Sequence, residues 1–243
     1  MRFIYCTLIF IFLQFFSVAK NNTKENKFNL NKKESNKLYT LNYEVFKNSI
    51  IIGDTLVARL ALHEMLAIKP DDSIAQEQLI EIYFNSGNFI QSFYLSQNYI
   101  RKNILNEFAL SKLGKSAELI HRYSDAQMAY DKLFYITNNP DYEYLVALMQ
   151  YNSFRYYEAI ITLDNLLKSP SVINKLCDVY VNDDIGTQHV PLSSVIWNLK
   201  GLIQFELKDF INAKKSVDES LKIFPDYFFA RKNLEQISNS LPK

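Results

Sequence analysis

The sequence predicts an all-α solenoid, in which short helical hairpins stack along one axis. From residue 39 onward, apolar residues recur at the three- to four-residue spacing of amphipathic helices, and few segments alternate as strands do. A small residue also returns at a nearly constant interval, in steps of 34, 34, 33 and 54, at Ala58, Ser92, Ala126, Ala159 and Ala213. The last step is one period plus about twenty residues, so the sequence predicts about five units and one insertion.

Other residues recur in phase with these five positions. An aromatic residue lies three positions before four of them, at Phe89, Tyr123, Tyr156 and Phe210. Proline follows three of them by eleven or twelve positions, at Pro70, Pro170 and Pro225. Small residues let two helices approach closely, and proline ends the second helix. Each unit is therefore expected to be an antiparallel helical hairpin that is marginal alone and is stabilised by its neighbours.

This pattern resembles the tetratricopeptide repeat family, whose unit of about 34 residues carries a large residue, Leu-Gly, an aromatic, Ala and Pro at set positions. The clearest copy is Trp197…Gly201…Phe210…Ala213…Val217…Pro225, followed by Leu110…Leu113-Gly114…Tyr123…Ala126…Tyr130. The sequence departs from the family pattern at Phe46, Ser92 and Lys200. The resemblance implies a superhelix whose inner groove is lined by the first helix of each unit.

The first nineteen residues predict a secretory signal peptide. Arg2 provides a positive start, Phe3 to Leu13 is an apolar run, and Ser17 and Ala19 are small residues before a cut at Lys20. A retained membrane anchor is the alternative, but the run is short for a span of about 20 residues. No other segment approaches a transmembrane length, so we expect no stable membrane span after cleavage. The chain is therefore expected to be exported, to a bacterial periplasm or the outside of the cell.

Residues 20–38 predict a flexible polar tether. They hold six Lys against two Glu and few large apolar residues, which cannot bury enough surface to offset the entropy of ordering. A solvated spacer and an attachment to an acidic surface are both compatible with this composition.

The predicted solenoid covers 39–243, with units at 39–72, 73–106, 107–139, 140–171 and 194–227. A capping helix is expected at 228–240, where Phe228, Phe229, Leu234 and Ile237 would cover the last unit. Between the fourth and fifth units lies the insertion 172–193. Its Val172 to Val181 segment is apolar enough to predict a short helix, and Asn182 to Pro191 predicts a loop.

The insertion also gathers carboxylates and an imidazole, at Asp178, Asp183, Asp184 and His189. Such groups suit divalent ions, but their spacing matches neither a calcium loop nor a zinc motif. We therefore predict no metal, and two interpretations stay open, a partner contact and a tolerated surface insertion.

The sequence offers no catalytic constellation. Gly114-Lys115-Ser116 resembles the end of a phosphate-binding loop, but Ala109 replaces the required Gly and the triplet falls inside a predicted helix. Removal of residues 1–19 leaves Cys177 as the only thiol, expected to be a small buried residue. The chain has 27 basic and 26 acidic residues, a balance that gives no reason to expect nucleic acid. We expect no enzyme activity and no cofactor.

What remains is the groove, whose residues the family resemblance implies on the first helices. They are Tyr43, Lys47, Glu77, Glu81, Phe84, Ser111, Lys115, Tyr144, Tyr151, Asn152, Asn198 and Phe205. This mixture of rings, amides and acids suits an extended peptide. An exported scaffold that binds a peptide or protein partner is the first hypothesis. A constitutive subunit of an envelope assembly is the second, and a glycan-binding or enzyme-accessory module is the third.

Overall fold

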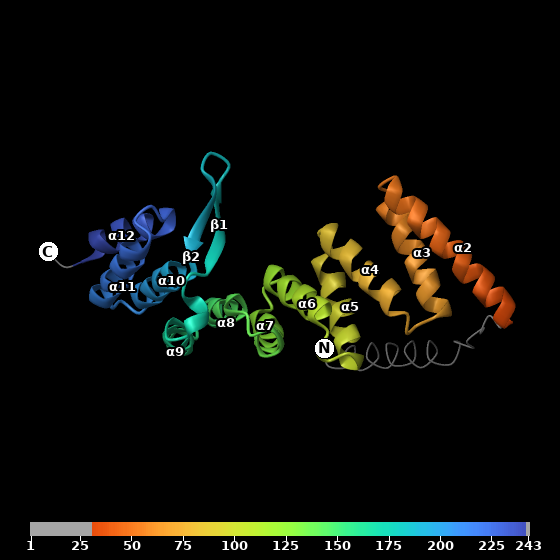
Figure 1. The fold of residues 1–243 in the computed structure, drawn as a ribbon, viewed down its shortest axis with the longest axis horizontal. Coiled ribbons are helices and arrows are strands. Elements are labelled where there is room, and N and C mark those ends of the chain that lie inside the picture. Colours follow the sequence, from red (N-terminus) through yellow and green to blue (C-terminus); the bar gives the residue numbers. More distant parts are fainter. Residues whose placement is uncertain (1–30, 242–243) are drawn as a thin grey trace, which may run out of the picture.

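The computed structural model describes residues 31–241. Within this range, eleven α-helices follow one another along an elongated molecule, interrupted by one two-stranded antiparallel sheet (Figure 1). The helices are α2 (Lys32–Ile51), α3 (Thr55–Ile68), α4 (Ser73–Asn85), α5 (Phe89–Lys102), α6 (Glu107–Leu119), α7 (Tyr123–Thr137), α8 (Pro140–Asn152), α9 (Tyr156–Leu167), α10 (Leu192–Glu206), α11 (Phe210–Ile223) and α12 (Phe228–Ser240).

The helices form five hairpins, α2–α3, α4–α5, α6–α7, α8–α9 and α10–α11, and α12 packs on the last of them. Every turn inside a hairpin contains one residue in the left-handed region, at Gly53, Gly87, His121, Phe154 and Lys208, with φ between 59° and 76°. This shared turn reverses the chain in the same way five times. The predicted all-α solenoid of helical hairpins is therefore confirmed.

Short polar side chains begin many of these helices. The carboxylates of Asp54, Asp72 and Asp209 accept from amides in the first turns of α3, α4 and α11. Asn139 caps α8, whose first residue is Pro140. Such caps satisfy amide groups that have no partner inside the helix, so each of these four helices starts at a position that its own sequence specifies.

The core is continuous along the stack rather than gathered at one centre. Four apolar clusters follow each other, and part-buried residues belong to two clusters at a time. Leu95 joins the first cluster along the chain to the second, Leu148 joins the second to the third, and Tyr144 joins the third to the last. Each hairpin therefore contributes its apolar face to both neighbours, as expected for a solenoid.

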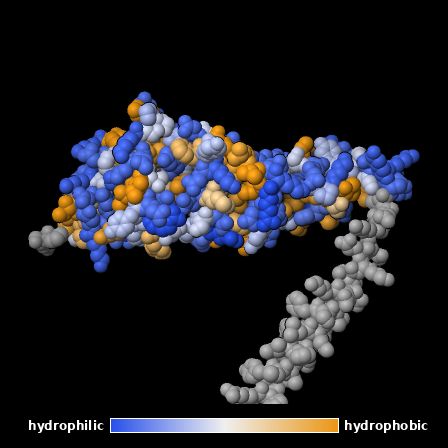
Figure 2. Space-filling model, turned by 90° about the horizontal axis from the view of Figure 1, so that it is seen from below, coloured by the Kyte–Doolittle hydropathy of each residue, from blue (hydrophilic) through white to orange (hydrophobic). Residues whose placement is uncertain are grey.

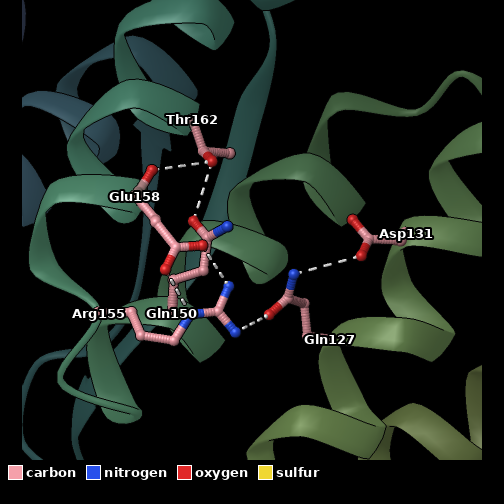
Figure 3. A network of polar contacts seen from close by, with 6 residues as sticks. All are labelled: Gln127, Asp131, Gln150, Arg155, Glu158 and Thr162. Atoms are coloured by element: carbon pink, nitrogen blue, oxygen red, sulfur yellow. Dashed lines mark hydrogen bonds and ion pairs between the residues drawn. The ribbon is translucent and has the colours of Figure 1, made fainter.

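A polar network also links the second helices of the third and fourth hairpins (Figure 3). Arg155, at the start of α9, donates from Nη1 to Oε1 of Gln127 on α7 at 2.9 Å and pairs with Glu158 at 2.7 Å. Gln127 in turn donates to Asp131 at 3.3 Å, and burial raises the pKa of Asp131. The network connects α7 to α9 across the boundary between two hairpins.

Part of the predicted tether is helical, which corrects the bounds 20–38. Helix α2 begins at Lys32 because Asn31 and Glu34 form a capping box, in which each side chain accepts from the backbone of the other. The polar side chains of this first part of the helix stay exposed, so the helix forms without burying them. Residues 20–30 of the tether and the predicted signal peptide at 1–19 lie outside the described residues.

The insertion is a β-hairpin and not the expected helix and loop. After a short 3-10 helix at Pro170–Val172, strand β1 (Leu176–Asn182) pairs with strand β2 (Gly186–Pro191). Cys177 and Val179 face the helices, whereas Leu176, Asp178 and Tyr180 face solvent. Burial along β1 alternates from one residue to the next, as it does in a strand, and does not follow the three- to four-residue spacing of a helix.

Candidate functional site

The first helices of the N-terminal hairpins carry the predicted groove residues on one surface. We call the surface formed by α2, α4 and α6 the first-helix face, and its residues are Tyr43, Ile74, Glu77, Glu81, Phe84, Ser111, Lys112 and Lys115. On α4, these residues recur at three- to four-residue spacing and lie opposite the buried Leu79 and Ile82. Amphipathic helix formation therefore places them together.

An apolar cleft of about 300 Å³ lies between α2, α3 and α4. Its lining includes Tyr43, Phe46, Leu62, Met65 and Ile74. Tyr39 also lines it and donates a hydrogen bond to Asp72, while the Lys69 ammonium lies 3.7 Å from the centre of the Tyr39 ring. The cleft is thus an apolar depression with a fixed polar rim, large enough for one side chain of a partner.

A charged pair occupies the middle of the first-helix face. Nζ of Lys112 lies 2.7 Å from a Glu81 carboxylate oxygen and 4.4 Å from the centre of the Phe84 ring. Burial by itself would raise the pKa of Glu81, but the hydrogen bonds from Lys112 and Asn85 hold it below its usual value. The Lys112 side chain is only 17% exposed, so the pair is a fixed element of the surface.

Other predicted residues of this face differ in their exposure and in the contacts that they make within the chain. The Glu77 carboxylate accepts from the Tyr99 hydroxyl at 2.8 Å and from the Asn106 amide at 3.3 Å. Lys115 is exposed, Ser111 is half-buried, and Lys47 pairs with Glu44 at 3.3 Å near the end of α2. Glu77 therefore links α4 to α5 and to the start of α6, whereas Lys115 is open to a partner.

The β-hairpin covers the corresponding surface of the fourth and fifth hairpins. Cys177 and Val179 of β1 pack with Tyr144 of α8, Phe205 of α10 and Tyr227 in one cluster. Burial raises the pKa of the Cys177 thiol to about 11 and that of Tyr227 to about 12, and it also raises the pKa of Tyr144. These groups are therefore shielded from water by the chain's own hairpin.

Asn198 is engaged inside the chain as well. Its side chain is buried, and its amide oxygen accepts from the Asn233 amide of α12 at 2.8 Å. Tyr151 and Asn152 are half-buried at the end of α8, where the Tyr151 ring lies 5.8 Å from the ring of Tyr156. The structure thus exposes Tyr43 and Lys47 of α2 and Lys115 of α6, buries Asn198 of α10, and leaves the other predicted residues half-buried.

The three histidines do not form a site together. His63 contacts Tyr83 at 3.0 Å, His121 contacts Tyr123 at 2.8 Å, and His189 contacts Asp178 at 2.6 Å across the β-hairpin. Among residues 31–241 no group of three His, Cys, Asp or Glu side chains could hold a metal ion. Gly114-Lys115-Ser116 lies inside α6, where the backbone amides are occupied by the helix.

Two residues of the first-helix face were missed by the sequence analysis. Ile74 is exposed at the edge of the cleft, and Lys112 contacts both Glu81 and Phe84. Glu81 and Lys112 carry opposite charges on successive first helices, and this was the signal available for them.

On the face shown in Figure 2, hydrophilic residues cover most of the surface and hydrophobic residues form separate patches.

Comparisons with known proteins agree with this architecture. The search of solved structures finds a MamA protein, with a TM-score of 0.55 and 14% identity over 86% of this chain and 98% of that one. It also finds a tetratricopeptide repeat protein from Parabacteroides merdae, with a TM-score of 0.59 and 12% identity over 84% of this chain and 73% of that one. YrrB, described as a tetratricopeptide repeat protein with an unusual peptide-binding site, has a TM-score of 0.59 at 10% identity over 78% of this chain and 88% of that one.

The chain has the tetratricopeptide repeat fold. No protein-family model and no curated protein sequence matches it. At identities of 10–14%, this chain and these proteins share the architecture although few of their residues are identical. Within residues 31–241 no helix is both long and apolar enough to cross a membrane.

Proposed function

We propose that this protein is an exported, non-enzymatic scaffold that binds a peptide or protein partner on its first-helix face. The observation that carries the proposal is the surface of α2, α4 and α6, which holds an apolar cleft lined by Ile74 and, about two helical turns farther along α4, the fixed Glu81–Lys112 pair. Apolar depressions next to oriented polar groups suit an extended segment, because its side chains enter the depressions while its backbone meets the polar groups. The peptide-binding site named for YrrB, which has the same fold, supports this choice.

The test uses a library of random twelve-residue peptides displayed on phage and selected on the full chain. Selected peptides are then titrated against Tyr43→Ala, which removes a ring from the cleft, and Tyr135→Ala, which removes an exposed ring from α7. We expect Tyr43→Ala to weaken binding by about tenfold, since an aromatic anchor is a common hot spot, and Tyr135→Ala to leave it unchanged. Equal effects of the two substitutions, or no selected peptide, would contradict the proposal.

Export is proposed from residues 1–19. Amino-terminal sequencing of the protein purified from its own source is expected to begin at Lys20. A mature chain that still begins at Met1 would contradict cleavage and favour a retained segment.

A second candidate function, a constitutive subunit of an envelope assembly, is favoured by one observation. Large apolar side chains are exposed around the turn between α2 and α3, at Ile51, Ile52, Leu56 and Leu60. Exposed apolar patches often mark protein interfaces. Light scattering separates the two functions, because a stable monomer supports transient partner binding and an obligate oligomer supports the structural role.

A further inference from the structure

The β-hairpin presents one backbone edge on the side away from α12. Strand β2 lies on the side of α12, since Gln188 donates to the Asp226 carbonyl at 2.7 Å and accepts from the Phe228 amide at 3.0 Å. The β1 side of the hairpin is tied to α8, because Lys175 pairs with Asp141 at 2.9 Å. Figure 1 shows the same order, with β1 nearer to α6 and β2 nearer to α12. The outer edge of β1 therefore faces the hairpins that precede it.

The hydrogen-bond pattern identifies the backbone groups on this edge. The Leu192 amide donates to the Lys175 carbonyl at 2.8 Å, and the register pairs Cys177 with Val190. In antiparallel pairs, alternate residues direct their N–H and C=O groups toward the partner strand. The backbone N–H and C=O groups of Lys175, Cys177 and Val179 therefore point toward β2.

The intervening residues Leu176, Asp178 and Tyr180 direct their backbone groups to the outer edge. Within residues 31–241, the backbone of these three residues makes no hydrogen bond to another element.

Strand β1 has few of the features that protect edge strands, and Asp178 is its one charged residue. Its sequence, Leu-Cys-Asp-Val-Tyr-Val-Asn, contains neither Pro nor Lys, and its bulge lies only at the tip, between Tyr180 and Asn182. Natural edge strands usually carry such features because an unprotected edge pairs with other chains. The β1 edge is thus ready to accept a further strand.

The side chains of the hairpin indicate which strand fits. Asp178, Asp183 and Asp184 make it acidic, Lys175 is already paired with Asp141, and His189 of β2 contacts Asp178 at 2.6 Å. Leu176 and Tyr180 flank Asp178 on the solvent face and are 58% and 60% exposed. A neighbouring strand with a basic residue opposite Asp178 and apolar residues on both sides of it complements this face.

A second copy of this chain fits less well. Two β1 strands paired antiparallel about Asp178 would place two carboxylates opposite each other, which is unfavourable.

We infer that β1 binds an extended segment of the partner by strand addition, with a basic residue opposite Asp178 and apolar residues opposite Leu176 and Tyr180. The inference rests on the proposed function, since the added strand is a segment of the same partner. Main-chain hydrogen bonds would supply affinity, and alternate side chains would supply specificity.

The test uses the full chain and a labelled, end-blocked peptide, Thr-Val-Thr-Lys-Thr-Val-Thr, followed by fluorescence anisotropy. Asp178→Pro removes the N–H group on the outer edge and leaves the bonds to β2 in place, whereas Asp178→Ala removes the same charge and keeps the N–H group. We expect Asp178→Pro to bind at least about tenfold more weakly than Asp178→Ala. Equal affinities of the two variants, or no binding by the unmodified chain, would overturn the inference.

A second measurement needs no protein variant. Two further peptides carry N-methyl groups on the even-numbered or the odd-numbered residues, and each loses the N–H groups of one edge. Strand addition predicts that one of the two loses binding to the unmodified chain; retention by both would overturn it. A sedimentation coefficient that rises with protein concentration in the absence of peptide would show that a second copy occupies the edge, which also overturns the inference. The effect of Tyr43→Ala is measured separately, with the peptides selected by phage display. The proposed function can therefore stand while the strand addition fails.

Discussion

Gly114 of α6 lies against the ring of Tyr130 of α7, so closely that a methyl group on Gly114 would stand 2.6 Å from Cε1 of that ring. Tyr130 is held in place, since it is buried and its hydroxyl donates to Glu118 at 2.8 Å. Gly201 has the same relationship with Val217 in the fifth hairpin, where the corresponding distance is 2.5 Å. Glycine on the first helix thus makes room for a large side chain on the second.

Gly114→Ala is expected to destabilise the protein by about 1–3 kcal/mol, because overpacking costs more than the gain in helix propensity of about 1 kcal/mol. Urea unfolding followed by circular dichroism measures the change. Lys115→Ala is the matched control, since the neighbouring side chain is exposed, and it should change stability by less than about 0.5 kcal/mol. A Gly114→Ala variant as stable as this control would show that the ring moves aside.

Ser92→Ala is expected to stabilise the protein by about 1 kcal/mol, because a buried hydroxyl without a hydrogen bond is costly. Ser92 is fully buried, and its Oγ has no partner within residues 31–241. The other four hairpins have Ala at the equivalent position. The reciprocal substitution Ala126→Ser should lower stability by a similar amount in the same urea experiment. Stabilisation by Ala126→Ser would refute the explanation.

Cys177 is expected to react slowly with thiol reagents in the folded protein. Burial raises the pKa of its thiol to about 11, so the reactive thiolate is scarce at pH 8. Iodoacetamide labelling, followed on the Cys177 peptide by mass spectrometry, should be at least about a hundredfold slower than in 8 M urea, where the thiol has its ordinary pKa of about 8.5. Equal labelling rates in buffer and in urea would mean that the helices do not cover the thiol.

Alkaline pH is expected to destabilise the fold through its buried tyrosines. Burial raises the pKa of Tyr227 to about 12, against an opposing hydrogen bond with Asn198. The folded-state pKa lies above the ordinary value of 10.0, so the folded chain holds the Tyr227 proton more tightly than the unfolded chain does. The stability that this difference contributes is fully present below pH 10 and is lost as the pH rises toward 12. Each such tyrosine contributes a slope of about 1.4 kcal/mol per pH unit in this window.

Tyr227→Phe tests this assignment, since phenylalanine does not ionise. The variant should lose stability less steeply between pH 10 and 12 than the unmodified chain, as measured by urea unfolding at several pH values. Parallel curves would show that Tyr227 ionises equally easily in the folded and unfolded chains.

The repeat architecture could be predicted from the sequence because its packing uses the same residue types at a constant interval. The small residues at Ala58, Ala126 and Ala213 are all fully buried between helices. The capping box of α2 was also visible as Asn31 followed by Glu34, but the polar composition around it favoured a tether. Composition averages over a segment and does not detect a local cap.

The β-hairpin was missed because a short apolar segment is ambiguous between helix and strand. Its signal was the alternation of Cys177, Val179 and Val181 with polar or exposed residues, followed by a turn at Gly186 with φ of 75°. The covering of Tyr144 could not be predicted for the same reason. It depends on where the hairpin folds back, which no repeat pattern encodes.

The β-hairpin also shows where this architecture accepts extra chain. It enters between α9 and α10, yet α10 still packs on α8 and α9. Its tip at Asp183 to Ile185 is exposed and extends beyond the helices (Figure 1). An affinity tag or a fluorescent reporter grafted at that tip would therefore leave the stack intact and sit within reach of anything bound beside it.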